Sequence, residues 1–229
     1  MKKNRRLVFF PILINLKKFP CLVVGGGKVA YRKVLALLEF NTKITIVSPR
    51  LCRPLIELAA KNKIIIIKKS YSKEYLKNIK IVFCTTDNEK INKAVNNDCT
   101  ASGILINVAD KPSLCDFILP ANLKRGDLTI SVSSQGKAPF YAKEIKNKLD
   151  DLIPPVYADI IRLAGQFRSH LLTNLNNRGD AGLKKRSAKV KAKMFNRFSK
   201  TNWEEVIAGN DGRPSSYYIR KILKGNYKS

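Results

Sequence analysis

The sequence predicts an α/β protein: a parallel-sheet domain, then a small α+β segment, then a helical C-terminal domain. Short apolar strands alternate with amphipathic helical stretches through the first half of the 229 residues, which is the pattern of a parallel sheet covered on both faces. A glycine-rich turn at residues 25–27 separates the first strong strand from the first helix. After Pro155 only helical or irregular patterns remain, which sets the end of the chain apart from its beginning.

In the first half, each expected element follows from the spacing of its apolar residues and from the turn residues that bound it. Strands are expected over residues 9–16, 21–24, 43–47, 64–68, 81–84 and 104–108. Helices are expected over residues 28–39, 54–61 and 90–102. In the first of these helices Ala30, Val34 and Leu38 are each about one helical turn apart, so they share one face.

The pattern changes after the last of these strands. Further strands are expected over residues 116–118 and 128–133, separated by a turn at 124–127. A helix is expected over residues 139–152, and the two prolines that follow it end it. The predicted domains are residues 1–112, 113–153 and 154–229.

Charge is the unusual feature of the composition. Forty-four Lys and Arg residues face seventeen Asp and Glu residues, which gives a formal net charge of +27. Such a field attracts anions and raises their concentration at the surface. The excess is spread along the chain, and only Lys184, Lys185 and Arg186 begin a dense basic run. A solvated Lys-rich face, an anionic metabolite, an anionic membrane and nucleic acid are each compatible with this composition.

The five cysteines lie far apart and form no CxxC pair. An odd, dispersed set is typical of reduced thiols in a cytoplasmic protein rather than of a disulfide framework or a zinc site. The single histidine, His170, argues against a histidine-based metal site. Pro11 and Asn15 interrupt the apolar run near the N-terminus, so we expect neither a secretory leader nor a membrane span.

The segment from Gly25 to Ala30 fits the pattern G-x-G-x-x-A, a form of the dinucleotide fingerprint. Gly25 permits a tight turn, Gly27 lets the backbone approach a pyrophosphate, and Ala30 is small enough for close packing of the helix on the sheet. The helix N-terminus offers N–H groups and a positive dipole end to the phosphates. Because the turn follows a strand and opens a helix, it predicts a Rossmann-type domain that binds NAD. The alternative is a glycine-rich turn without a ligand.

The residue that grips the ribose hydroxyls is expected about twenty positions further on, as a carboxylate at the end of the second strand. That position reads Ser48-Pro49-Arg50. Ser48 can form a hydrogen bond with a hydroxyl, although less firmly than a carboxylate does. Arg50 would favour the 2′-phosphate of NADP, so NADP stays open as an alternative to NAD.

Several further motifs occur in a fixed order. They are residues 22–30 with Arg32-Lys33, Thr85-Thr86-Asp87 with Asn92, Asn107-Val108-Ala109-Asp110, the run CDFILPA at 115–121 and the run SVSSQGKAP at 131–139. Over about residues 9–155 the chain therefore resembles the precorrin-2 dehydrogenase family, whose members include the N-terminal module of siroheme synthase and a bifunctional dehydrogenase–ferrochelatase. Residues 157–172 resemble the helical C-terminal part of that family more loosely.

The resemblance implies NAD-dependent oxidation of precorrin-2 to sirohydrochlorin, a step of siroheme biosynthesis. A dehydrogenase alone, and a dehydrogenase that also inserts ferrous iron or cobalt, stay open as alternatives. The resemblance further implies a homodimer, with residues 113–153 as the dimerisation segment and the helical domain closing the active-site cleft. The basic surface suits an anionic tetrapyrrole that carries many carboxylates.

The resemblance assigns the catalytic role to Asp110, the aspartate of the Asn-Val-x-Asp motif. Asp110 follows a strand, and the carboxyl ends of parallel strands line the ligand crevice, so it would accept the proton that the macrocycle loses. Without the resemblance, a turn-forming aspartate before Lys111-Pro112 is the simpler interpretation. The expected cofactor-binding residues are Gly25, Gly26, Gly27, Lys28, Val29, Ala30, Ser48, Pro49, Arg50, Thr85 and Thr86.

Three residues are candidates for binding the tetrapyrrole. Ser134 lies in a Ser-Ser-x-Gly turn that matches a family position near the substrate, although Gln135 stands where the family usually has a second glycine. A simple turn serine is an equally compatible interpretation. Lys137 and Arg168 carry charges that would suit the carboxylates of the substrate.

The rival interpretation is a basic nucleic-acid-binding protein with an incidental Rossmann fold. It requires aromatic residues clustered beside basic ones, or a recognisable binding module. Phe195, Phe198 and Trp203 are the only candidates in the sequence, and helical core spacing explains them as well. We therefore expect an enzyme that acts on a metabolite and has no nucleic-acid partner.

Overall fold

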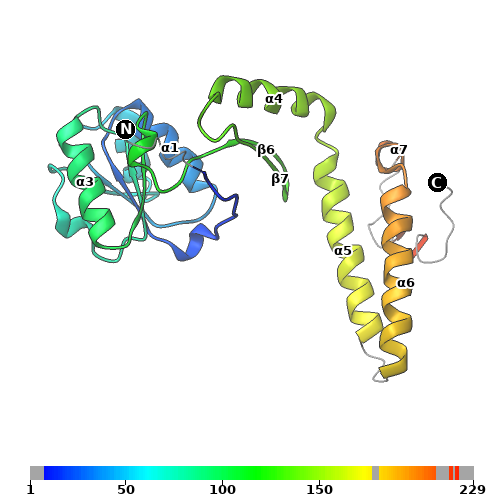
Figure 1. Cartoon of the computed structure of the whole chain (residues 1–229). Helices are drawn as coiled ribbons and strands as arrows, with labels where there is room; N and C mark the ends of the chain where they lie inside the picture. Colours follow the sequence, from blue (N-terminus) through cyan, green and yellow to red (C-terminus); the bar gives the residue numbers. More distant parts are fainter. Residues whose placement is uncertain (1–7, 177–180, 210–216, 219, 222–229) are drawn as a thin grey trace, which may run out of the picture. The chain divides into compact units, whose positions relative to one another are not determined.

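The computed structural model describes residues 8–176, 181–209, 217–218 and 220–221, with the backbone alone for 174–176 and 181–187. The chain divides into two compact units (Figure 1). The first is Met1–Leu119 with Gln135–Lys137, and the second is Pro120–Ser134 with Ala138–Ser229. The division into domains at residues 112 and 153 stays a prediction.

A five-stranded parallel sheet forms the centre of the first unit. Its strands are β1 (Cys21–Val24), β2 (Ile44–Val47), β3 (Ile65–Ile67), β4 (Ile81–Cys84) and β5 (Leu105–Val108). Their order across the sheet is β3-β2-β1-β4-β5, and every neighbouring pair is parallel. The predicted α/β fold with a parallel sheet is confirmed.

Helices cover both faces of this sheet. They are α1 (Lys28–Leu38), α2 (Arg53–Ala60) and α3 (Glu89–Ala101), with short 3-10 turns at Leu16–Lys18, Lys73–Leu76 and Pro112–Leu114. Side chains alternate along each strand, so that Val23 and Phe83 pack on the face of α1 and α2 while Leu22 and Val82 pack on the face of α3. Because both faces are covered, β1 and β4 are buried throughout, which explains their continuous apolar sequences.

The strand expected over residues 9–16 is wrong. In the described chain this segment pairs with no strand and leads into the 3-10 turn Leu16–Lys18. Pro11 removes a backbone donor from its middle, and the apolar side chains of Phe10 and Leu13 are 84% and 87% exposed. The apolar composition suggested a strand, but a strand also needs an edge with which to pair.

The strand expected over residues 116–118 is also wrong. Asp116 bonds to β5 through its N–H, which donates to the Ile106 carbonyl oxygen at 2.9 Å, and through its carboxylate, which accepts the Ile106 N–H at 3.0 Å, but no strand continues over residues 117–118. The next strand of the chain is β6 (Ala121–Arg125) instead. The sequence did not reveal it because Leu123 is its one buried residue.

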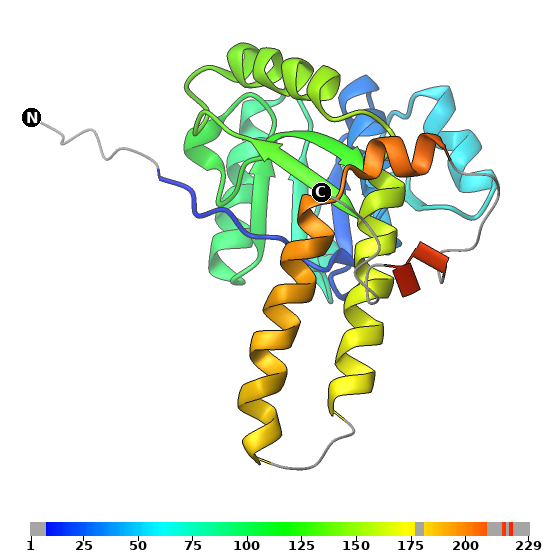
Figure 2. The same cartoon turned by 90° about the vertical axis from the view of Figure 1, so that its right-hand side faces the viewer.

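Among its described residues, the second unit contains a hairpin followed by helices. They are β6, β7 (Leu128–Val132), α4 (Pro139–Leu152), α5 (Tyr157–Asn176), α6 (Ala181–Lys200) and α7 (Trp203–Ala208). The hairpin is antiparallel and turns through Gly126, whose φ of +57° suits a two-residue loop. Helices α5 and α6 run antiparallel and side by side in both views (Figures 1 and 2). No helix in the described part of the chain is both long and apolar enough to cross a membrane.

An aromatic core joins α5, α6 and α7. Phe167 is 1% exposed, and its ring stacks on Phe198 with centroids 5.1 Å apart. Phe198 in turn contacts Trp203 at 4.4 Å, and the Trp203 indole N–H donates to the Phe198 carbonyl oxygen at 2.7 Å. Phe195 meets Phe167 edge-on at 6.2 Å. Core packing therefore accounts for Phe198 and Trp203, whereas Phe195 is 37% exposed and meets this core only through the ring of Phe167.

Arg125 ties the end of β6 to the end of α4. Its Nε donates to the Ile153 carbonyl oxygen at 2.8 Å, one Nη donates to the Asp150 carbonyl oxygen at 3.1 Å, and an ion pair joins Arg125 to the Asp150 carboxylate. Lys146 forms a second ion pair with this carboxylate at 2.8 Å. Hydrogen bonds from Lys146 and Arg125 hold the pKa of Asp150 below its usual range. Arg125 thus satisfies carbonyl groups that the end of a helix leaves without partners.

We expect the substitution Arg125→Met to loosen the hairpin from α4. The Arg125 side chain is 16% exposed, and its loss removes the donors to two backbone carbonyl groups. We expect the Tm, followed by circular dichroism, to fall by about 2–6 °C. Because the pKa of Asp150 is lower in the folded chain than in the unfolded chain, its carboxylate stabilises the fold at pH values above the usual pKa of Asp. This stabilisation is lost as the pH falls through the pKa of the folded chain. The difference between wild type and variant should therefore shrink below about pH 3.

Arg53 offers the matched control for this variant. It pairs with Glu57 at 3.0 Å on the surface of α2, and its side chain is 90% exposed. Exposed pairs of this kind contribute little to stability. Arg53→Met should leave the Tm nearly unchanged, and a fall as large as that of Arg125→Met would contradict the role given to Arg125.

Candidate functional site

The carboxyl ends of β1 and β4 meet at the switch point of the sheet. The chain leaves β1 toward β2 and β3, and then returns to β4 on the other side of β1. In open parallel sheets the ligand binds at the carboxyl edge, where the connections diverge in this way. The loops after Val24 and Cys84 border this point, and they begin with two of the predicted cofactor residues, Gly25 and Thr85.

Two of the three glycines fold tightly against the neighbouring loops. Gly25 has φ +117°, and a Cβ added to it would lie 2.7 Å from the Thr85 hydroxyl oxygen. A Cβ added to Gly26 would lie 2.1 Å from the Arg50 carbonyl oxygen and 2.9 Å from the Ser48 hydroxyl oxygen. These two glycines therefore allow the turn to pack against the loops that follow β2 and β4.

The third glycine, Gly27, faces open space. No other part of the described chain comes within 4 Å of the position that its Cβ would take. Gly27 is also the N-cap of α1, where it provides no side-chain cap, and the first turn holds no acidic residue. The first N–H groups of this helix, at Lys28, Val29 and Ala30, thus lack the usual partners. An open cradle beside free donors and a positive helix end fits the pyrophosphate of a dinucleotide.

The loop after β2 is held by one of the predicted ribose-binding residues. The buried Ser48 hydroxyl donates to the Arg50 carbonyl oxygen at 2.6 Å and so closes the turn. Pro49 and Arg50 are exposed beside it. The first role of Ser48 is therefore to shape the turn that Gly26 packs against. Contact of Ser48, Pro49 and Arg50 with the adenosine half of the cofactor stays a prediction.

The loop after β4 is fixed by its own hydrogen bonds. The Thr85 N–H and hydroxyl both donate to the Val24 carbonyl oxygen, at 2.8 and 3.0 Å. The Thr86 hydroxyl accepts the Asn88 N–H at 3.0 Å, and the buried Asn92 amide donates to the Thr86 carbonyl oxygen at 3.2 Å. This edge of the site is thus preorganised, which lowers the cost of binding a ligand. Thr85 and Thr86 as neighbours of the nicotinamide stay a prediction.

Asp110 follows β5 on the same edge of the sheet as the glycine turn. The Ala109 N–H donates to the Cys84 carbonyl oxygen at 2.8 Å, which extends the pairing of β5 with β4 by one residue. Asp110 itself is exposed and has φ +59°, a conformation that Asp and Asn adopt more readily than most residues. An exposed carboxylate on a left-handed backbone at this edge is compatible with a functional role.

Lys33, for which no role was predicted, interacts electrostatically with Asp110. It is half-buried on α1. Burial lowers the pKa of its ammonium group, Arg32 lowers it further, and Cys115 and Asp110 act in the opposite direction. Lys33 is therefore within electrostatic range of Asp110. The Arg32-Lys33 pair in the family-like motif was its one signal in the sequence.

Cys115 holds the loop that follows Asp110. Its sulfur accepts the Val108 N–H at 3.1 Å and lies 3.2 Å from the Val108 carbonyl oxygen. Burial raises the pKa of the Cys115 thiol, so the group stays neutral at physiological pH. Its contribution is to the shape of the loop, a role that spacing alone did not indicate.

The three predicted substrate residues occur in different parts of the chain. Ser134 is half-buried, and its hydroxyl oxygen accepts the Ala138 N–H at 2.9 Å, which braces its own turn. Lys137 and Arg168 are exposed. Lys137 belongs to the first compact unit, while Ser134 and Arg168 belong to the second. Their grouping into one substrate site stays a prediction.

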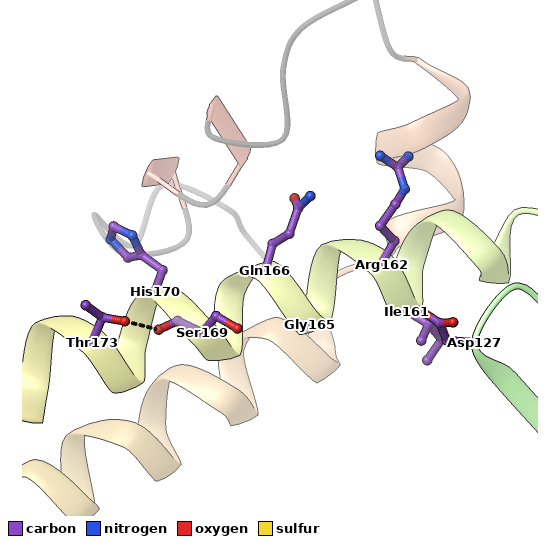
Figure 3. A pocket seen from close by; sticks show the side chains of 8 residues that line it. All are labelled: Asp127, Ile161, Arg162, Gly165, Gln166, Ser169, His170 and Thr173. Atoms are coloured by element: carbon purple, nitrogen blue, oxygen red, sulfur yellow. Dashed lines mark hydrogen bonds between the residues drawn. The ribbon is translucent and has the colours of Figure 1, made fainter. Parts of the chain in front are cut away.

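A groove of about 610 Å³ runs along α5 in the second unit. Figure 3 shows Arg162, Gln166 and His170 following one another along this helix, with Asp127 of the hairpin turn at one end. The groove is lined by Asp127, Ile161, Arg162, Gly165, Gln166, Ser169, His170 and Thr173. Arg168 is not among these residues. The side chains of the basic run at 184–186 lie outside the described residues.

A known protein family matches most of the first unit. The family described as "Putative NAD(P)-binding" matches residues 12–121. This stretch holds all five strands of the sheet, the glycine turn, the loop at Thr85 and Asp110. Residues 12–121 thus form an NAD(P)-binding domain, in agreement with the cofactor expected from the glycine turn.

Full-length relatives extend the similarity beyond this domain. The chain is 38% identical over 169 residues to the siroheme synthase of Ruthia magnifica subsp. Calyptogena magnifica, and 42% identical over 161 residues to that of Pseudoalteromonas translucida (strain TAC 125). The alignments cover 74% and 70% of this chain. The chain belongs to the siroheme synthase and precorrin-2 dehydrogenase family. The resemblance inferred from the motifs is thereby confirmed.

Members of this family differ in length. The alignments cover only 36% and 34% of the two siroheme synthases, so the chain spans about a third of their length. A solved structure titled "SirC, precorrin-2 dehydrogenase" matches with a TM-score of 0.67 at 23% identity, over 94% of this chain and 100% of that one. At this identity the likeness concerns the fold alone.

Proposed function

We propose that this chain uses NAD to oxidise precorrin-2 to sirohydrochlorin, a step in the biosynthesis of siroheme. The observation that carries the proposal is the carboxyl edge of the sheet. The open turn at Gly27 follows β1, and the exposed carboxylate of Asp110 follows β5. Only β4, with its preorganised loop at Thr85, lies between these two strands. A dinucleotide cradle and a proton acceptor on one edge are the two parts that a dehydrogenation needs.

The residues of the chain divide the work of this reaction. The N–H groups of the first turn of α1 hold the pyrophosphate, and the loop at Thr85 orients the nicotinamide half. When bound, NAD supplies the hydride acceptor. Asp110 accepts, at a carboxylate oxygen, the proton that the macrocycle loses. Lys33 supplies a positive charge that interacts with that carboxylate.

The charge of the chain supports an anionic tetrapyrrole as the substrate. A net charge of +27 raises the local concentration of a polycarboxylate and speeds its encounter with the protein. Ser134, Lys137 and Arg168 are the residues that we propose for binding its carboxylates. Ferrous iron or cobalt would be a second substrate, inserted after oxidation at the site of Asp110. The five free cysteines support a cytoplasmic location.

We further propose that the chain forms a homodimer through α4. Tyr141, Ile145 and Leu152 lie along one stripe of this helix, and they are 55%, 36% and 73% exposed. An exposed apolar stripe of this kind is typical of an interface between proteins. The proposal agrees with the dimerisation segment expected over residues 113–153.

Ile145→Glu tests the dimer, because it places a charge in the middle of this stripe. Sedimentation velocity should show a dimer for the wild type and a dissociation constant raised at least tenfold, about 1.4 kcal/mol, for the variant. Asn147→Glu adds the same charge at an exposed position on another side of α4 and should leave the dimer intact. A monomeric wild type, or equal effects of the two variants, would contradict this interface.

The proposed reaction is tested by an anaerobic spectroscopic assay with freshly generated precorrin-2. With NAD, the absorbance of NADH and the bands of sirohydrochlorin should rise together and in equal amounts. NADP, assayed in parallel, settles the preference that Arg50 leaves open. Ferrous iron or cobalt added after oxidation then tests insertion of metal. Folded protein that gives no turnover with either dinucleotide would refute the proposal.

A further inference from the structure

Gln135 binds the backbone of Phe9 with both ends of its side-chain amide. The Phe9 N–H donates to the Gln135 Oε1 at 2.7 Å, and the Gln135 Nε2 donates to the Phe9 carbonyl oxygen at 3.1 Å. The two residues are 126 positions apart, yet they belong to the same compact unit. This pair of bonds gives Phe9 the donor and the acceptor that a neighbouring strand would otherwise offer.

The backbone of Gln135 makes this contact unusual. Its φ is +56°, in the left-handed region that glycine adopts freely and that a residue with a Cβ adopts at a cost. Asn and Asp offset part of that cost with a short polar side chain that binds its own backbone, whereas the longer Gln135 side chain reaches Phe9 instead. A glutamine held in a glycine-like conformation indicates that the side chain contributes something that glycine cannot.

The contact lies next to the turn that carries two of the proposed substrate residues. Ser134 precedes Gln135 directly, and its hydroxyl oxygen closes the turn from inside by accepting the Ala138 N–H at 2.9 Å. Lys137 is two residues further along. The turn is therefore fixed at one point by Ser134 and at a second point by the bonds between Gln135 and Phe9.

We propose that Gln135 is a positioning residue for the substrate: by binding Phe9 it holds Ser134 and Lys137 in the orientation in which they meet the carboxylates of the tetrapyrrole. This inference rests on the proposed function of the turn. The two side-chain hydrogen bonds of Gln135 run to Phe9, which belongs to neither the glycine turn nor the loop of Asp110. Gln135 therefore affects the affinity for the substrate and leaves cofactor binding and the chemical step unchanged.

Substitution by both glycine and alanine separates this role from backbone strain. Gln135→Gly removes the two hydrogen bonds and relieves the strain, while Gln135→Ala removes the bonds and keeps the strain. If Gln135 positions the turn, both variants should raise the KM for precorrin-2 about tenfold, with kcat and the Kd for NAD unchanged. If only the backbone conformation matters, Gln135→Gly should be at least as stable as the wild type and should keep the wild-type KM, and that result would overturn the proposal.

Hydrogen exchange provides a readout that does not depend on turnover. Peptides that cover residues 8–15 should exchange faster in both variants, because the Phe9 N–H loses its acceptor. Gln135→Glu keeps an acceptor but loses the donor to the Phe9 carbonyl, so its exchange and its KM should fall between those of wild type and Gln135→Ala. If the wild type fails to oxidise precorrin-2, the proposed function is refuted, and hydrogen exchange alone tests the contact between Gln135 and Phe9. Faster exchange of residues 8–15 in both variants would support this contact, and unchanged exchange would overturn it.

Asn62 is the matched control. It is exposed on the loop after α2 with φ +54°, so Asn62→Gly relieves a similar backbone strain far along the chain from the turn. This variant should leave both the KM and the exchange of residues 8–15 at their wild-type values. An Asn62→Gly effect equal to that of Gln135→Gly would attribute the result to general loosening and would overturn the proposal.

Discussion

Asp110→Asn is expected to lower kcat for precorrin-2 oxidation by about 10²–10⁴ while leaving the Kd for NAD unchanged. The amide has nearly the shape of the carboxylate but cannot accept the proton that the macrocycle loses. Asn also tolerates the left-handed conformation of this position, φ +59°, so the backbone of the loop should be retained. Stopped-flow absorbance of NADH, with NAD binding measured by calorimetry, would separate the two effects.

Two further variants make this prediction specific. Asp110→Ala should lose turnover as well, although alanine adds strain at a positive φ and its stability must be measured beside its activity. Asp87→Asn removes an exposed carboxylate from the loop after β4, on the same edge of the sheet, and should retain turnover. Near-normal turnover in Asp110→Asn would remove Asp110 from the mechanism. An equal loss of turnover in Asp87→Asn would attribute the effect to the total negative charge at this edge of the sheet rather than to Asp110 itself.

The strands at the centre of the sheet were predictable because the signal for them is local. The expected bounds of 21–24 and 81–84 are those of β1 and β4, since four buried positions in a row, bounded by turn residues, leave little choice. The glycine turn was predictable for the same reason. Gly25 and Gly27 have sharply different surroundings, yet each follows from its place between a strand and a helix.

The failures share a different cause, because each depends on a partner far along the chain. Residues 9–16 have strand-like composition, but Phe9 meets the side chain of Gln135 instead of a strand. The strand β6 buries only Leu123 and was recognisable only by its pairing with β7. Lys33 was overlooked because its electrostatic interaction with Asp110 joins two residues that are far apart in the sequence. Local patterns predict elements, whereas such contacts need the three-dimensional fold.

Gly26→Ala and Gly27→Ala are adjacent substitutions that should fail in opposite ways. A Cβ at position 26 would lie 2.1 Å from the Arg50 carbonyl oxygen, which belongs to the backbone and cannot move aside cheaply. We therefore expect Gly26→Ala to lower the Tm by about 5–10 °C or to prevent folding. A Cβ at position 27 meets nothing in the described chain, and the extended conformation of Gly27, φ −87° and ψ −168°, suits alanine.

Gly27→Ala should accordingly keep its Tm within about 2 °C of the wild type, because the loss of a glycine N-cap costs little. Its Kd for NAD should rise about 10–100-fold, since the methyl group fills the space through which a pyrophosphate approaches the N–H groups of α1. Differential scanning fluorimetry and calorimetric titration of NAD measure the two effects separately. Unchanged NAD affinity in Gly27→Ala would show that the cradle is not where the dinucleotide binds. If Gly27→Ala lowered the Tm as far as Gly26→Ala does, residue 27 would also be tightly packed. The open space proposed to receive the pyrophosphate would then not exist.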